Sequence, residues 1–380
     1  MSTRTRLACT AAAIVPLAFL AAACSSSSSS SSPAAGAAAA GTQSSSSASF
    51  TPPAAPSTGT LTETGSSVMF PLVNEWEAGY VKQYPGIKIS TASTNSGTGI
   101  TDAGQGLVNI GTTDAYLSAS QSSKYPQVEN IPVGVDSIEV IYHLTGFTGQ
   151  LNVNGPVLAQ IYDGKITAWN DPAIAKLNPG ASLPATKIVT VHRGDSSGST
   201  VMVAQFLNIT DPADWSASQV SSTPTWPKTA GGLAETGSGA EVTGVASTNG
   251  AIGYVGGSYS AQIAKAKLSV AAVANAAGTY TLATQAALQA AVGSFPPAPA
   301  NGSELLINTK APTGYALTGY EYDVVNLKQP SSAQANLLQN FLYWTITTGS
   351  TAPYLNPVNF TALPPATLTV AENLIAKISS

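Results

Sequence analysis

The chain has 380 residues, with 15 Lys or Arg and 19 Asp or Glu, which gives a net charge of −4 at pH 7. No stretch concentrates basic residues, so the composition argues against a nucleic-acid partner. Its two cysteines, Cys9 and Cys24, both lie near the N-terminus. The remaining body of about 320 residues is long enough to bury a core without an internal disulfide.

The N-terminal residues have the pattern of an export signal. After two arginines comes an apolar run at residues 7–20, which is too short to cross a bilayer comfortably. Small residues then lead to Cys24, in an order similar to a bacterial lipobox, although Leu20 stands one place early. We expect residues 1–23 to be a lipoprotein signal peptide and Cys24 to carry a lipid. An ordinary signal peptide with an accidental cysteine is the alternative.

A low-complexity segment rich in Ser, Ala, Pro and Gly follows at residues 25–56, including eight consecutive serines from Ser25. Such a segment cannot bury enough apolar surface to order itself. We therefore expect residues 24–58 to be a disordered tether between the anchor and a folded body that begins near Gly59.

The first part of the body predicts short strands and helices. Apolar side chains recur every three or four residues over residues 72–84, which indicates a helix that ends before Pro85. Alternation at residues 87–91 predicts a strand. A Ser/Gly loop is expected at residues 93–99, before a short helix, and a buried strand at residues 107–110.

The rest of the body continues this alternation. In chain order, we expect a strand at 137–142, a helix from Pro156, a turn at 169–172, a strand at 188–191, a helix at 201–207, a strand at 251–255, and helices around 333–346 and 366–378. Alternating strands and helices indicate the α/β class. Because about 320 residues exceeds one typical core, two lobes are expected.

Four Ser/Gly segments stand where a predicted strand gives way to a predicted helix. They are residues 65–71, 95–99, 111–115 and 191–200. In an open α/β sheet, the loops at the carboxyl ends of the strands converge on one crevice. We therefore expect these four segments to meet at a binding site.

The segment at residues 191–200 is the most informative, because Arg193 is the only arginine after the N-terminal signal. It lies in a Ser/Gly turn between a predicted strand and a predicted helix. Hydroxyls, backbone N–H groups and a helix N-terminus would then surround one guanidinium. That combination binds a small oxyanion.

The chain resembles the phosphate-binding proteins of the PstS family, the extracytoplasmic receptors of the phosphate ABC importer. The resemblance is carried by residues 65–71, 93–99, 109–117, 166–179, 191–200 and 250–255. The likeness runs from about Leu61 to the end of the chain and is nearest to lipoproteins of actinobacterial type. It implies that this chain binds inorganic phosphate and delivers it to ABC transporter permease subunits. It also implies a lipid-anchored monomer outside the cytoplasm.

The resemblance implies a fold as well. The family has a periplasmic-binding-protein (type II) fold, in which two α/β lobes close on a ligand in the cleft between them. Residues 59–136 and 323–380 would form lobe 1, and residues 137–322 would form lobe 2.

Carried over position by position, the resemblance implies these phosphate-binding residues: Ser67, Met69, Phe70, Ser96, Asp114, Arg193, Ser197, Gly198 and Ser199. Arg193 would pair with phosphate and would be oriented by Asp195. Asp114 would accept a hydrogen bond from the proton that phosphate carries and sulfate lacks. Met69 stands where the family often has threonine, so Ser66, Ser67 or only the backbone would serve there.

A different reading of residues 194–198 is the nucleophile turn of chymotrypsin-like serine proteases, to which Gly-Asp-Ser-Ser-Gly is similar. A serine hydrolase needs a histidine base and an aspartate to orient it, and the chain has only His143 and His192. Strand alternation would turn His192 away from Arg193, so we expect no enzyme. We also expect no metal and no cofactor, because His and Cys do not cluster. A different oxyanion, or phosphate sensing in place of uptake, stays open.

Overall fold

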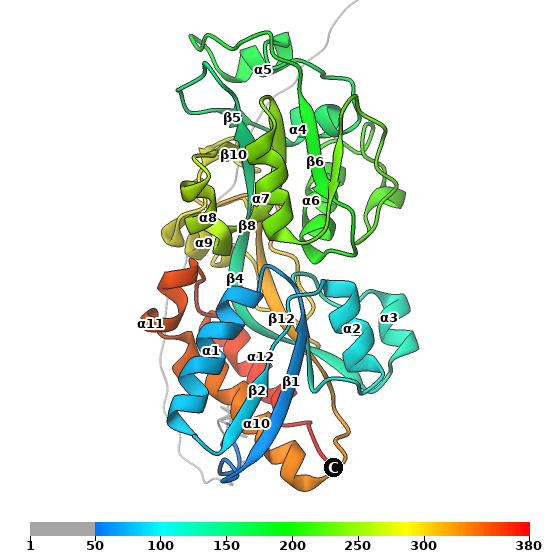
Figure 1. The fold of residues 1–380 in the computed structure, drawn as a ribbon, viewed down its shortest axis with the longest axis vertical. Helices are drawn as coiled ribbons and strands as arrows, with labels where there is room; N and C mark the ends of the chain where they lie inside the picture. The colour runs from blue at the N-terminus through cyan, green and yellow to red at the C-terminus, as the bar shows by residue number, and fades with distance from the viewer. Residues whose placement is uncertain (1–49) are drawn as a thin grey trace, which may run out of the picture. The chain divides into compact units, whose positions relative to one another are not determined.

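The computed structural model describes residues 50–380. Its α/β class agrees with the prediction, because helices flank a mixed sheet that has nine strands within the described residues (Figure 1). The strand order is β2-β1-β3-β12-β4-β8-β6-β7, with β9 also paired to β4. The predicted signal peptide, Cys24 and most of the predicted tether lie outside the described residues.

The first lobe is built on the strands from β2 to β4. Their bounds are β1 (Gly59–Gly65), β2 (Ile87–Ser90), β3 (Ile110–Thr113), β4 (Val128–His143) and β12 (Thr318–Asn326). β1 pairs in parallel with β2 and β3, whereas β12 runs antiparallel to β3 and β4. The carboxyl ends of β1 and β3 therefore lie at the same edge.

Helices cover both faces of this lobe. They are α1 (Phe70–Gln83), α2 (Ser96–Gly104), α3 (Ala119–Lys124), α10 (Ser332–Ile346), α11 (Ala352–Leu355) and α12 (Pro365–Ile375). Val324 packs in one core cluster with Ile100 of α2, and its neighbour Val325 packs in another with Leu72 of α1. Successive residues of a strand point to opposite faces, so α1 and α2 lie on opposite sides of the sheet.

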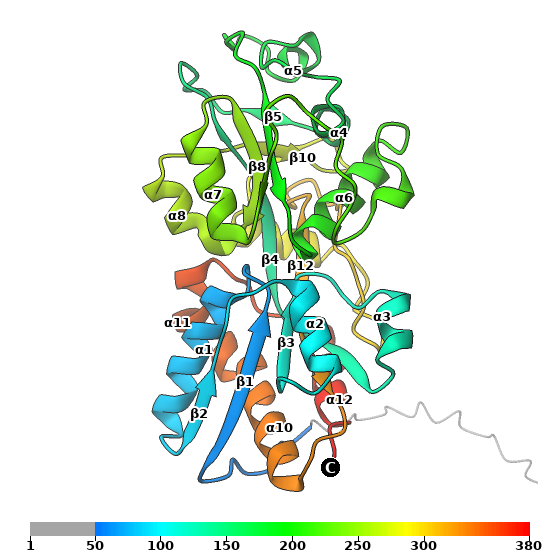
Figure 2. The ribbon, with the colours of Figure 1, turned by 45° about the vertical axis from the view of Figure 1, so that its right-hand side comes forward.

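The second lobe begins where β4 changes partner. Residues 128–137 of β4 pair with β12, and residues 138–143 pair with β8 (Ala251–Gly256). Beyond β8 lie β6 (Val189–Arg193) and β7 (Leu233–Glu235), both in parallel. β9 (Ser269–Val270) pairs with β4 as well. β4 and the start of β12 thus run between the lobes, as Figure 2 shows from a second side.

The remaining elements of the second lobe are a small sheet and six helices within the described residues. They are β5 (Asn152–Val153), β10 (Ala272–Ala274), β11 (Tyr280–Thr281), α4 (Gly155–Tyr162), α5 (Pro172–Leu177), α6 (Gly198–Thr210), α7 (Ser238–Ser247), α8 (Ser260–Lys265) and α9 (Gln285–Val292). The chain returns to the first lobe at Thr318, where β12 first pairs with β4. This point lies a few residues before the predicted boundary at 322.

Two predicted elements in the first lobe need correction. The expected loop at 93–99 is partly helical, because the Asn95 side chain accepts a hydrogen bond from the Thr98 N–H (2.9 Å) and starts α2 at Ser96. The strand predicted at 107–110 is wrong. Leu107 is 65% exposed, and β3 begins only at Ile110.

Two predictions in the second lobe were too short. The strand expected at 137–142 is the second part of the 16-residue β4. At 169–172 only a turn was expected, but Asp171 accepts from the Ala173 N–H (2.8 Å) and caps α5, whose first residue is Pro172.

The folded body also starts earlier than the predicted Gly59. Phe50 packs edge-on against Tyr343 of α10, with ring centroids 5.8 Å apart. Asn340 of the same helix donates a hydrogen bond to the Pro53 carbonyl (3.0 Å). The last residues of the predicted tether therefore contact the first lobe.

Helix α2 lies unusually close to the sheet because glycines face each other there. A Cβ added to Gly111 of β3 would lie 2.1 Å from the Gly99 carbonyl oxygen of α2. This approach brings the N-terminus of α2, with Ser96, to the carboxyl end of β3.

We predict that Gly111→Ala lowers the free energy of unfolding by about 1–3 kcal/mol or more, because a methyl group overpacks this contact. Urea denaturation measures the change. Gly239→Ala in α7 is the control, since the nearest atom to its Cβ would be Tyr259 Cε1 at 3.8 Å. Equal destabilisation in the two variants would contradict the account of α2 packing.

Candidate functional site

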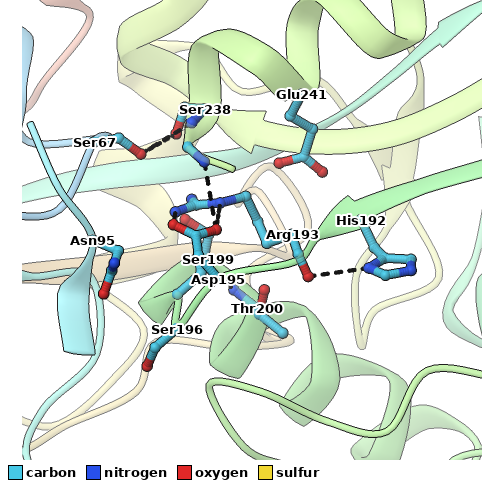
Figure 3. A network of polar contacts seen from close by, with 12 residues as sticks. Ser67, Asn95, His192, Arg193, Asp195, Ser196, Ser199, Thr200, Ser238 and Glu241 are labelled. Atoms are coloured by element: carbon cyan, nitrogen blue, oxygen red, sulfur yellow. Dashed lines mark hydrogen bonds and ion pairs between the residues drawn. The ribbon is translucent and has the colours of Figure 1, made fainter. Parts of the chain in front are cut away.

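Several of the predicted site residues, among them Ser67, Arg193 and Ser199, lie close together between the two lobes (Figure 3). The Ser199 N–H of α6 donates to Asp114 Oδ2 (2.8 Å), just after β3. The Gly198 N–H donates to Ser96 Oγ (3.0 Å), at the start of α2. These hydrogen bonds between lobes join three of the four predicted loops. The fourth, at residues 65–71, is joined to them through the Ser66 hydroxyl, which donates to Asp114 Oδ1.

Arg193 is the last residue of β6 and is only 3% exposed. Its backbone N–H donates to the Tyr254 hydroxyl (3.2 Å). Its side chain donates through two nitrogens to the two oxygens of Asp195 (2.6 and 2.7 Å). A guanidinium has five N–H groups, so this bidentate pair leaves three for other acceptors. Asp195 thus holds the Arg193 fork through both of its oxygens.

One cation here faces several carboxyl groups. Burial alone would lower the pKa of Arg193, but the hydrogen bond to Asp195 and the charges of Glu241, Asp195 and Asp114 raise it overall. Burial raises the pKa of Glu241 well above its usual range, which favours its neutral form. Arg193 therefore stays charged in a water-poor site, where its attraction for an anion is least screened.

The N-terminus of α6 adds backbone donors to the site. The Ser197 hydroxyl caps this helix by accepting from the Thr200 N–H (3.3 Å), and the Ser197 N–H donates to the Ser222 carbonyl (3.0 Å). Gly198 is required here, because a Cβ on it would lie 2.8 Å from the Asp114 nitrogen. The positive end of the helix dipole thus points at the site.

Asp114 is 1% exposed and accepts hydrogen bonds from both lobes. Ser66 Oγ of the first lobe donates to its Oδ1. The Ser199 N–H (2.8 Å) and hydroxyl (2.5 Å) of the second lobe donate to its Oδ2. An acceptor at this position can distinguish an anion that carries a proton from one that does not.

The segment at 65–71 behaves only partly as expected. Ser67 Oγ accepts from the Ser238 N–H (3.0 Å) and contacts the Ser238 hydroxyl (2.8 Å). The Met69 side chain lies in the apolar core, so it offers no side-chain contact to a ligand. The Phe70 N–H, expected to face phosphate, donates to the Ser66 carbonyl (3.1 Å), since it lies within the first turn of α1.

Ser238 and Glu241 of α7 are site residues that the sequence interpretation missed. Ser238 is 1% exposed and bonds Ser67 across the lobes, and Glu241 lies beside the Arg193 fork. The signal was present, because residues 236–239 are a fifth Ser/Gly turn between a strand and a helix. It was overlooked since β7 has only three residues and no clear alternation.

A cleft of about 730 Å³ opens beside these contacts. Ser96, Gly97 and Thr113 of the first lobe contribute to its lining, as do Ser196 and Gly198 of the second. A small polar ion entering from solvent would therefore meet hydroxyls and the start of α6.

The histidines do not pair with the serines of the turn. His192 stacks on Trp226 (centroids 4.5 Å apart) and its Nδ1 contacts the Arg193 carbonyl oxygen (3.0 Å). As expected from strand alternation, the ring points away from the Arg193 side chain (Figure 3). Ser196 Oγ donates to Ser222 Oγ instead (2.9 Å).

Residues 50–380 lack two other features. In that part of the chain, no three His, Cys, Asp or Glu side chains are arranged to hold a metal ion. No helix there has the length and apolar character to span a bilayer.

We predict that Asp195→Ala lowers the free energy of unfolding by about 3 kcal/mol, because it leaves a buried guanidinium without its bidentate partner. Asp214→Ala, which breaks the exposed pair with Lys165, should change it little. Chemical denaturation at neutral pH measures both variants. An equal loss of unfolding free energy in the two variants would contradict the argument that burial makes the loss of the Arg193–Asp195 pair costly.

Comparison with known proteins gives consistent matches. The PBP superfamily domain matches residues 51–348. A phosphate-binding protein PstS of Xylella fastidiosa (strain 9a5c) is 30% identical over 320 residues, covering 83% of this chain and 85% of that protein. Phosphate-binding protein PstS 3 of Mycobacterium leprae is 27% identical, covering 76% and 79%. The crystal structure of a phosphate binding protein from Stenotrophomonas maltophilia matches with a TM-score of 0.65 at 22% identity, covering 83% and 93%.

Proposed function

Because this chain belongs to the PstS family of phosphate-binding proteins, we propose that it is an extracytoplasmic receptor that binds inorganic phosphate between its lobes and delivers it to an ABC importer. The observation that carries this proposal is the Arg193 fork, whose pair with Asp195 leaves three N–H groups for other acceptors beside the N-terminus of α6 and Asp114. Permease subunits of the importer are the proposed partners, and the receptor is proposed to act as a monomer.

Phosphate would be held by one cation and many neutral donors. Arg193 would supply a planar fork, Gly198 and Ser199 their backbone N–H groups, and Ser67 and Ser96 their hydroxyls. All five residues are buried, which supports a site that strips water from its ligand. We propose a structural role for Ser197, whose oxygen caps α6.

Asp114 would select phosphate over sulfate. Near neutral pH, phosphate keeps at least one proton and can donate it to the Asp114 carboxylate, whereas sulfate presents only acceptor oxygens. An unmade buried hydrogen bond to a charged group costs about 1–3 kcal/mol, and the repulsion of like charges adds to this. Selectivity would therefore come partly from rejecting the wrong anion.

We predict that the folded chain binds phosphate but not sulfate in calorimetric titrations after bound phosphate is stripped by unfolding and refolding. Arg193→Lys should weaken phosphate binding at least about tenfold, because a lysine cannot form the planar fork. Asp114→Asn should weaken phosphate binding similarly and allow sulfate to bind.

Asp211→Asn is the matched control, since Asp211 lies at the opposite end of α6 and should leave both affinities unchanged. Wild-type protein that binds neither anion would refute the receptor proposal. Tighter binding of arsenate or sulfate than of phosphate would keep the fold and assign another oxyanion. Phosphate binding without importer-dependent uptake in cells would favour a sensing role.

We further propose that Cys24 is lipidated and that residues 24–49 link the membrane anchor to the folded body. The small residues before Cys24 and the Ser-rich composition after it support this. A branch of actinobacterial type is also proposed, although the relatives from Xylella and Mycobacterium have similar identities.

We predict that Cys24→Ser moves the protein from the membrane fraction to the medium, because one thioether-linked lipid anchor would be lost. Cys9→Ser, inside the proposed signal peptide, should leave the protein in the membrane fraction. Fractionation with mass spectrometry of the mature N-terminus measures this. An unmodified Cys24 in membrane-bound wild-type protein would rule out the lipid anchor.

A further inference from the structure

A row of buried carboxyl groups crosses the sheet beneath the proposed site. Asp114 follows Thr113, which pairs with Tyr322, so Asp114 lies next to Glu321 on β12. Asp136 of β4 lies two residues from Gly134, the partner of Glu321, at the point where the chain passes between lobes. Glu321 and Asp136 are fully buried and Asp114 is 1% exposed.

Glu321 has no ordinary partner for its burial. Both carboxyl oxygens are buried, and neither meets a hydrogen-bond donor within the described residues. The Asp136 Oδ2 atom is likewise buried and has no hydrogen-bond donor within the described residues. A buried ionised carboxylate without a donor or a cation is very costly, and no metal-binding arrangement surrounds these groups among residues 50–380.

The neighbour that Glu321 does have is Asp114. The two carboxyl groups are within hydrogen-bonding reach of each other, and such a bond requires a proton between them. Burial, with the charges of Asp114 and Asp136, raises the pKa of Glu321 well above its usual range. Asp114 already accepts three hydrogen bonds from Ser66 and Ser199, whereas the Glu321 oxygens have no donor among the described residues, so a protonated Glu321 could donate to Asp114.

We propose that Glu321 is a positioning residue that keeps a proton and donates it to Asp114, so that Asp114 faces the bound anion as an ionised acceptor. This inference rests on the proposed phosphate site and explains how that site holds an acceptor carboxylate against an anion. An ionised Glu321 would add a second negative charge near the ligand. It would also compete with Asp114 for the proton of the ligand.

The sign of the pH dependence follows from this arrangement. A group whose pKa is raised is neutral at low pH and becomes charged as pH rises through that value. Loss of the Glu321 proton should therefore weaken phosphate binding on the alkaline side, by up to about tenfold per pH unit. The other titratable groups near Glu321 are Asp114, Asp136 and Tyr322. Glu139 lies near Asp136, and Arg193 of β6 acts on Asp114 through its charge.

The test is infrared spectroscopy with inorganic phosphate bound, at about pH 8, where unperturbed carboxyl groups are ionised. Wild-type protein should show a protonated-carboxyl band that Glu321→Gln lacks. Glu139→Gln is the matched control, because burial raises the pKa of Glu139 only to about 7, so its removal should take away mainly an ionised-carboxylate band. Loss of only an ionised-carboxylate band in Glu321→Gln would overturn the proposal.

Calorimetry measures phosphate affinity and its dependence on pH, and a residue with only a structural role would not change that dependence. Glu321→Gln keeps a neutral donor, so its phosphate affinity at pH 7 should stay within about threefold of wild type, whereas Glu321→Met, without a donor, should lose about tenfold or more. Where wild-type affinity falls as the pH rises, the affinity of Glu321→Gln should stay constant, and that of Asp136→Asn should fall as in wild type. The opposite pattern would assign the proton to Asp136 and overturn the proposal.

Two outcomes separate this inference from the function on which it rests. Wild-type protein that fails to bind phosphate at pH 7 would refute the proposed function. Wild-type protein that binds phosphate but shows no protonated-carboxyl absorption at pH 8 would refute the role of Glu321 alone, and this holds even if Glu321→Gln does not fold.

Discussion

The structure of this site depends on keeping one guanidinium charged inside the protein. Arg193 is almost fully buried at the end of β6, and its bidentate pair with Asp195 is the contact that makes this burial tolerable. A buried pair of this kind is weak evidence for stability, but it fixes the direction of the remaining N–H groups. Loops from both lobes meet near these N–H groups.

Backbone proximity is the second requirement of the site. Gly198 lets the start of α6 touch the backbone at Asp114, and Gly111 lets α2 lie against β3. These contacts place N–H groups of one lobe beside side-chain oxygens of the other, as with Gly198 and Ser96. Neutral donors at helix starts thereby supply positive potential without more cations, which fits a body with few basic residues.

The interior of the first lobe is correspondingly rich in acid groups. Glu321 and Asp136 lie behind Asp114 without donors for all of their oxygens among the described residues. A protein that binds an anion would repel it if all of these groups were charged. Protonation of the deeper carboxyls resolves this conflict, because it turns a source of repulsion into a hydrogen-bond donor.

The sequence alone determined the α/β class, the helices at α1, α6, α10 and α12, and the place of Arg193 in a Ser/Gly turn between a strand and a helix. These were readable because periodicity, caps and Ser/Gly turns are local signals. Only the tertiary structure decided that Ser238, Glu241 and Glu321 lie near the proposed site, and that the Met69 side chain lies in the core. Their roles arise from strand pairing and from contacts between lobes, and neither leaves a pattern among neighbouring residues of the chain.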